Sequence, residues 1–274
     1  MRVEDLLVYG KSHCHSDHAK ILLAELLHKN YLELLNCLEE IVDEKDVILY
    51  KEEIKALEEG KPLQYVMGYV NFYGNQFDID QRVLIPRFET EELVENVIKY
   101  INQFFKEPID IVDLGCGSGV IGITIEKKVS IHSLNLIDIS LDALEVTKKN
   151  CKKMNSKGEC IQNDFLQNIT KRYDVIVSNP PYIKEHEEIE EIVKNNEPHI
   201  ALYSGKDGLD CYHKILSNIS KNMKDRCLIA FEIGYQQADD IIKIANQYLE
   251  NIHIEVKKDL SGKDRMLFIL RNLE

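Results

Sequence analysis

From about residue 109 onward, short apolar runs alternate with amphipathic stretches of helical periodicity, and no other feature of the sequence constrains the fold as strongly. Such alternation is typical of α/β domains in which helices cover a mostly parallel, doubly wound sheet. Only residues 257–265 separate the last two runs, which is too short for a helical crossover, so the final strand is expected to be antiparallel. The seven expected strands are residues 109–113, 134–139, 160–163, 173–178, 228–233, 252–256 and 266–270.

The first part of the chain has a different rhythm, because its apolar residues recur at helical spacing, as they do over residues 21–26. We expect three or four helices there. Ser16 with Asp17 supplies the expected N-cap of the second one, and Gly60 ends the last.

This change of rhythm predicts two domains. Residues 1–75 are expected to form a small helical domain, and residues 76–274 are expected to form the α/β domain. Between them, residues 69–85 are expected to provide a hairpin linker, closed by the pair Gly74 and Asn75.

Composition limits the partners of the chain. Its formal net charge of −13 and the lack of a basic run argue against tight, sequence-independent binding to nucleic-acid phosphates. No stretch reaches the roughly 20 consecutive apolar residues that a membrane span requires. Glu4 and Asp5 stand where a signal peptide would be apolar. We therefore expect a cytoplasmic monomer that contacts neither nucleic acid nor a membrane.

No metal site is expected. The seven cysteines are scattered and include no C-x-x-C pair, which argues against a disulfide framework or a zinc ribbon. His13, Cys14, His15 and His18 lie close together but lack a second ligand group at zinc-like spacing. We interpret them as a loop that enters a helix.

A glycine-rich turn follows the first expected strand directly. Glycines at such a turn let a ligand approach the backbone, at the sheet edge where α/β proteins bind ligands. A nucleotide-like ligand is therefore expected. The candidate contacts are Asp113, Gly115, Cys116, Gly117, Ser118 and Gly119.

Side chains at the ends of the next two strands complete this nucleotide site. Asp138 is placed to accept hydrogen bonds from ribose hydroxyls, an arrangement that fits a dinucleotide or S-adenosylmethionine. Asp164 and Phe165 suit the exocyclic amine and the ring face of an adenine. The motif at the end of the fourth strand favours S-adenosylmethionine over a dinucleotide.

That strand runs into Asn179, Pro180, Pro181 and Tyr182, the most specific motif in the sequence. The prolines have no N–H, so the turn presents carbonyl acceptors with few competing donors. The Asn179 amide oxygen and the Pro180 carbonyl can each accept one hydrogen of a planar NH₂ group, while Tyr182 packs on its face.

The motif indicates methyl transfer to a planar nitrogen. The lone pair of such a nitrogen is delocalised, so acceptors on both hydrogens favour the electron-rich nitrogen of the transition state. The methyl group of S-adenosylmethionine is already activated, so alignment supplies most of the catalysis.

Beyond these two motifs, the chain resembles the release factor glutamine methyltransferases, also called N(5)-glutamine methyltransferases, over nearly its whole length. The further residues that carry the resemblance are 62–65, 68, 72–74, 83–87, 89–91, 197–198, 205–210, 232–234, 259 and 262–265. Phe88 stands where this family commonly has proline, and Phe165 stands where tryptophan is frequent.

The resemblance implies a Rossmann-like class I methyltransferase domain and a helical N-terminal domain that helps to hold the release factor. It also implies methylation of the glutamine in the factor's Gly-Gly-Gln loop. Two other substrates stay open: an adenine amine in nucleic acid, which the net charge disfavours, and a glutamine of a ribosomal protein.

Overall fold

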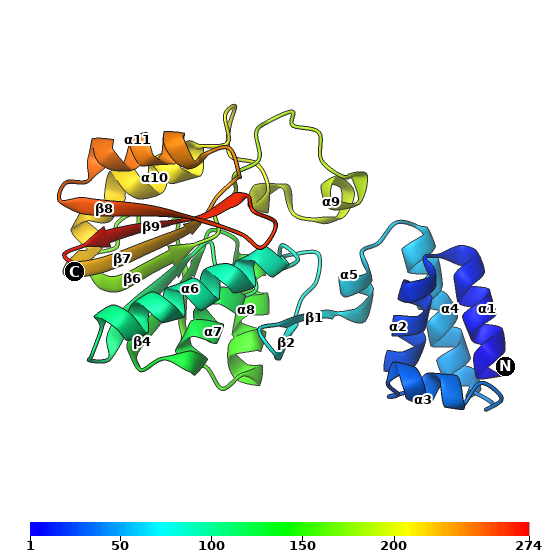
Figure 1. Ribbon diagram of the computed structural model, residues 1–274. Coiled ribbons are helices and arrows are strands. Elements are labelled where there is room, and N and C mark those ends of the chain that lie inside the picture. The colour runs from blue at the N-terminus through cyan, green and yellow to red at the C-terminus, as the bar shows by residue number, and fades with distance from the viewer. Residues whose placement is uncertain (274) are drawn as a thin grey trace. The chain divides into compact units, whose positions relative to one another are not determined.

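The computed structural model describes residues 1–273 of the chain (Figure 1). Within them the chain forms two compact units. Unit 1 comprises Met1–Tyr69 together with Glu190–Asn196, and unit 2 comprises Val70–Ile189 together with the described residues from Glu197 onward. None of the described helices has both the length and the apolar character that crossing a membrane demands.

Unit 1 is helical, which confirms the predicted helical region. Its apolar helix faces meet in a core that includes the fully buried Leu6, Leu23 and Ile54. Asn196 donates from its side chain to the carbonyl of Gly60 at 3.0 Å, so α9 joins this unit from much later in the chain. The helices are α1 (Val3–His13), α2 (Ser16–Leu26), α3 (Tyr31–Asn36), α4 (Glu44–Glu58), α5 (Leu63–Met67) and α9 (Glu191–Asn196).

The second helix begins in a way that the sequence did not predict. Its N-cap is His15, whose ring nitrogen accepts the N–H of Asp17 at 3.4 Å. The predicted cap at Ser16 is wrong because Ser16 is already the first helical residue. Among the residues that the structure describes, no three His, Cys, Asp or Glu side chains gather as metal ligands would.

Gly10 lies where α1 closely approaches α2 and α4. A Cβ atom at Gly10 would stand 2.1 Å from the Tyr50 hydroxyl oxygen and 2.7 Å from the Ala19 Cβ. Tyr50 is fully buried and donates its hydroxyl to the Ala19 carbonyl at 3.1 Å. These three residues therefore set the spacing of the three helices.

Unit 2 contains a seven-stranded sheet in the order β5-β4-β3-β6-β7-β9-β8. The first five strands of this order are parallel, whereas β9 pairs antiparallel with both β7 and β8. The predicted mostly parallel sheet with an antiparallel last strand is confirmed. The strands are β3 (Ile109–Leu114), β4 (Ile131–Asp138), β5 (Glu159–Gln162), β6 (Tyr173–Ser178), β7 (Met223–Glu232), β8 (Ile252–Lys258) and β9 (Asp264–Arg271).

Helices cover both faces of this sheet, as Figure 1 shows. On one face lie α6 (Phe88–Phe104), α7 (Val120–Lys128) and α8 (Leu141–Lys153); on the other lie α10 (Asp210–Ile219) and α11 (Ala238–Tyr248). Each face has its own apolar core. Two short 3₁₀ helices, His199–Ala201 and Ser220–Asn222, also belong to this unit.

The predicted hairpin is present as β1 (Tyr69–Phe72) and β2 (Asn75–Asp78), but other residues close it. The two loop residues are Tyr73 and Gly74, with φ angles of +48° and +76°. Both lie in the left-handed region that a type I′ hairpin turn requires. The expected closing pair of Gly74 and Asn75 is therefore wrong by one residue, because Asn75 already begins β2. The domain boundary at residue 75 stays a prediction.

Replacing Gly10 tests the close helix approach in unit 1. Gly10→Ala should lower the free energy of unfolding by about 1–3 kcal/mol, because overpacking a filled contact forces the helices apart. Urea denaturation followed by circular dichroism measures this change. Val8→Ala is the control, since Val8 is exposed on the same helix and its replacement should leave the midpoint unchanged. Equal midpoints for both variants would contradict the prediction.

Candidate active site

The glycine-rich turn lies at the carboxyl end of β3. Gly115, Gly117 and Gly119 have φ angles of +68°, +54° and +82°, which residues with a side chain rarely adopt. The N–H groups of Gly115 and Cys116 donate to the Ile137 carbonyl of β4 at 2.8 and 3.0 Å. The turn is therefore attached to the neighbouring strand before the chain enters α7.

Asp138, at the end of β4, holds the same turn through its carboxylate. One oxygen accepts the N–H of Gly117 and the other accepts the N–H of Ser140, both at 2.9 Å. Burial raises the pKa of Asp138 above its ordinary value, whereas these hydrogen bonds favour the charged form. Each carboxylate oxygen can accept more than one hydrogen bond, so Asp138 can also bind ligand hydroxyls.

Two buried polar side chains of α8 support the turn from behind. Thr147 donates its hydroxyl to the Gly117 carbonyl at 2.6 Å. Asn150 donates to the carbonyls of Ser118 and Asp78, each at 2.9 Å. Sequence reasoning missed Thr147 and Asn150, because an isolated polar residue on an amphipathic helix gives no sign of facing inward.

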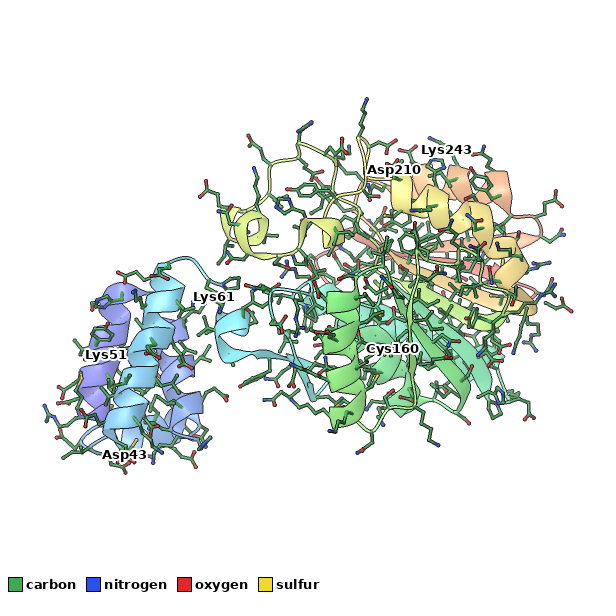
Figure 2. The ribbon with its side chains drawn as sticks, turned by 180° about the vertical axis from the view of Figure 1, so that it is seen from behind. Asp43, Lys51, Lys61, Cys160, Asp210 and Lys243 are labelled. Atoms are coloured by element: carbon green, nitrogen blue, oxygen red, sulfur yellow. The ribbon has the colours of Figure 1, made fainter. Side chains whose placement is uncertain are left out.

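A cavity of about 300 Å³ opens beside the turn. Its walls come from the ends of β3, β4, β5 and β6 and from the region of residues 198–205. Asp210, at the start of α10 in Figure 2, also contributes to the wall. Because β4 and β6 flank β3 on opposite sides, this is the topological switch point where doubly wound sheets bind ligands. The predicted site residues that line the cavity are Gly115, Gly117, Asp138, Asp164, Phe165, Asn179 and Pro181.

The other predicted residues lie outside the cavity wall, and their roles in binding stay predictions. They are Asp113, Cys116, Ser118, Gly119, Pro180 and Tyr182. Asp113 is fully buried, and one of its carboxylate oxygens accepts the N–H of Gly122 at 2.9 Å. Its other oxygen has no hydrogen-bond partner among the described residues, and burial raises the pKa of Asp113 to about 7. In this structure Asp113 joins β3 to α7.

The loop after β5 presents an aromatic ring to the cavity. Phe165 has a left-handed φ angle of +49°, and Asn163 stabilises this conformation by donating to the carbonyls of Phe165 and Gln167 at 3.1 and 2.7 Å. Asp164 forms an ion pair with Lys214 of α10. Lys214 also lines the cavity, which its isolated position in the sequence did not indicate.

The turn after β6 is held at both of its ends. Before it, Ser178 donates its hydroxyl to the Leu114 carbonyl of β3 at 2.6 Å. After it, the Tyr182 carbonyl accepts a hydrogen bond from the Gln237 side chain at 3.0 Å. Gly208 packs closely against Tyr182, and only a residue without a side chain fits there, because a Cβ at Gly208 would stand 2.3 Å from the Tyr182 carbonyl oxygen.

The side chain of Asn179 contacts α6. Its amide nitrogen donates to the hydroxyl oxygen of Thr90 at 3.4 Å, a long hydrogen bond. Among the described residues no group donates to the Asn179 amide oxygen, and Asn179 lines the cavity. The amide oxygen therefore keeps its capacity to accept a hydrogen bond.

Glu197 fixes another part of the cavity wall. This side chain is almost fully buried and accepts the backbone N–H of Ile85 at 3.0 Å. It also forms an ion pair with Arg87, with 2.5 Å between the nitrogen and the oxygen. Val83 and Leu84, which line the cavity, are thereby held by a residue more than 100 positions later in the chain.

A doubly wound sheet with an antiparallel β9 between β7 and β8 and a ligand-sized cavity at its switch point has the class I methyltransferase fold. The family model of the methyltransferase small domain matches residues 72–199, and that of the PrmC N-terminal domain matches residues 15–68. A solved structure of ribosomal protein L11 methylase from Lactobacillus delbrueckii subsp. bulgaricus is similar in fold, with a TM-score of 0.51 and 18% identity. That similarity covers 68% of this chain and 80% of the other.

Sequence similarity to named relatives identifies one family within this class of methyltransferases. The release factor glutamine methyltransferase of Bacillus cereus is 35% identical over 279 residues, covering 98% of this chain and 99% of the relative. The protein of the same name from Clostridium acetobutylicum is 35% identical over 290 residues, covering 99% of both chains. The chain belongs to the release factor glutamine methyltransferase family.

Proposed function

We propose that this enzyme transfers a methyl group from S-adenosylmethionine to the side-chain amide nitrogen of the glutamine in the Gly-Gly-Gln motif of peptide chain release factors. The observation that carries the proposal is the position of Asn179. Its amide oxygen has no donor among the described residues, and it stands at the same cavity as Asp138 and Phe165. An acceptor for a planar NH₂ group and a nucleotide-type site thus share one cavity.

The cavity fits S-adenosylmethionine in size and in chemistry. Its volume of about 300 Å³ lies at the lower end of the range for small-molecule sites. Asp138 can accept hydrogen bonds from the ribose hydroxyls, and Ile139 and Phe165 provide apolar surface for the adenine ring. A Cβ at Gly117 would meet no atom within 4 Å, so the backbone there is open to a ligand.

When bound, S-adenosylmethionine supplies a methyl group activated by a positively charged sulfur. The protein's task is then to present the acceptor nitrogen. We propose that the Asn179 amide oxygen and the Pro180 carbonyl each accept one hydrogen of the glutamine NH₂ group. These acceptors increase the electron density on nitrogen as its lone pair leaves conjugation, so they bind the transition state better than the ground state.

Within the enzyme, Pro180 and Pro181 favour this task because neither has an N–H that would compete for the acceptors. Burial raises the pKa of Tyr182 to about 12, so its ring is uncharged at neutral pH and suited to pack on a planar amide. We further propose that the helical residues 1–75 help to hold the release factor.

The first test concerns the substrate. A folded release factor should accept labelled methyl groups from S-adenosylmethionine, with the label on the glutamine of its Gly-Gly-Gln motif by mass spectrometry. A factor with alanine at that position is the control and should stay unlabelled. Duplex DNA and transfer RNA should not react, since a chain of net charge −13 repels phosphates. Labelling of nucleic acid or of a ribosomal protein alone would overturn the proposal.

The second test concerns the cofactor. Asp138→Ala should weaken S-adenosylmethionine binding by about 1–3 kcal/mol, because hydrogen bonds to a charged acceptor are lost. Isothermal titration calorimetry measures this. Asp142→Ala removes an exposed carboxylate nearby in the sequence and should leave the affinity unchanged. Parental affinity in Asp138→Ala would show that the ribose binds elsewhere.

The third test concerns the acceptor oxygen. Asn179→Ala should lower the single-turnover rate of methyl transfer by about 10²-fold or more, while cofactor affinity changes less. Asn179→Asp keeps an acceptor oxygen and should retain more activity than Asn179→Ala. Asn218→Ala, on the exposed face of α10, is the control. Transfer at the parental rate by Asn179→Ala would rule out this hydrogen-bond model.

A further inference from the structure

Asn179 is the end of a short chain of hydrogen bonds that reaches into the core of unit 2. Its amide nitrogen donates to Thr90 of α6 at 3.4 Å, and Thr90 donates its hydroxyl to a carboxylate oxygen of Glu232 at 2.7 Å. Thr90 is 3% exposed and Glu232 is 1% exposed, so water does not compete with these bonds. The Asn179 amide also favours the ionised form of Glu232.

The chemistry of these groups determines which group donates in each of the two hydrogen bonds. An ionised carboxylate can only accept, so the single Thr90 proton must point at Glu232. The Thr90 oxygen is then left with lone pairs only, and the Asn179 group beside it must be the NH₂ end of the amide. The amide oxygen is thereby turned away from α6.

We propose that Glu232, acting through Thr90, is a positioning residue that holds the Asn179 amide with its oxygen toward the cavity. The inference rests on the proposed function, because that oxygen matters only if it accepts a hydrogen of the substrate amide. Neither Thr90 nor Glu232 lines the cavity, so their effect on the reaction passes through Asn179.

Protonation of Glu232 would release the Asn179 amide from this fixed orientation. A protonated carboxyl can donate to Thr90, which frees the Thr90 proton to donate to an oxygen of Asn179. The amide can then turn over and present NH₂ to the NH₂ group of the substrate, so two donors meet without an acceptor. Alignment of the nitrogen is lost, and the rate falls while the cofactor site is untouched.

Several charged or titratable groups face Glu232 from the surrounding elements. Arg265 of β9 favours the carboxylate, whereas Glu89 of α6 opposes it. The partly buried Tyr182 and the fully buried Tyr212 lie close enough for their phenols to interact with its charge. Burial outweighs the favourable contacts and raises the pKa of Glu232 to about 7. The ionised form is therefore lost as the pH falls through neutrality, and the rate of methyl transfer should fall with it.

Single-turnover methyl transfer to a release factor, at saturating S-adenosylmethionine and across the neutral pH range, tests the inference. The parental enzyme should lose rate as the pH falls through about 7 and should level off near the rate of Glu232→Gln. Glu232→Gln should be slower by about tenfold or more above pH 7 and should lack this pH dependence, because an amide does not titrate in this range.

Substitutions at Thr90 provide a second and milder probe. Thr90→Val keeps the shape and removes the hydroxyl, so the rate should fall by about tenfold, with cofactor affinity unchanged by calorimetry. Thr90→Ser restores the hydroxyl and should restore the rate. Thr124→Val is the matched control, because the buried Thr124 hydroxyl of α7 has no hydrogen-bond partner among the described residues. It should keep both the parental rate and the parental pH profile.

Two results would overturn the inference: a parental rate for Thr90→Val, or an unchanged pH profile for Glu232→Gln. Failure of the proposed function has a different signature, since the parental enzyme itself would then not methylate the factor. If Glu232→Gln did not fold, the Thr90 series alone would still decide, because Thr90→Val must be slow and Thr90→Ser must not be.

Discussion

The site depends on the satisfaction of backbone polar groups in a turn whose left-handed φ angles favour glycine. Three left-handed glycines leave the N–H and carbonyl groups after β3 without the partners that a strand or helix would give them. Asp138, Thr147 and Asn150 supply those partners from two other elements. Thr147 and Asn150 therefore shape the cavity without lining it, whereas Asp138 both holds the turn and faces the cavity, and the floor of the cavity is preorganised before any ligand binds.

The turn after β6 also has an irregular backbone, but fewer of its polar groups need partners. Its two prolines carry no N–H, so the backbone there has acceptors only, and Ser178 and Gln237 tie its two ends to β3 and to the start of α11. One turn thus offers backbone open to a ligand, and the other offers bare acceptors. Both features come from residue types with unusual backbones, which is why the sequence alone revealed them.

The sequence predicted features that depend on local patterns, but it did not predict contacts between residues far apart in the chain. Apolar rhythm predicted all seven strands, since burial acts on each strand locally. Contacts between distant residues leave no local pattern. Thr90 and Glu232 are 142 positions apart. The hairpin turn was placed one residue late because Tyr73 adopts a left-handed φ that its side chain disfavours. The α2 cap was missed because His15 is not a usual capping residue.

The order of the strands bears on how the enzyme comes into being during synthesis. Strand β9, which follows the other six strands of this sheet in the sequence, lies inside the sheet between β7 and β8, and it brings Arg265 next to Glu232. A nascent chain that ends before residue 264 leaves the edge of β7 unpaired and the core without Phe268. Folding of the α/β domain must therefore wait until β9 has been synthesised, because a chain truncated before residue 264 lacks a strand from the interior of the sheet.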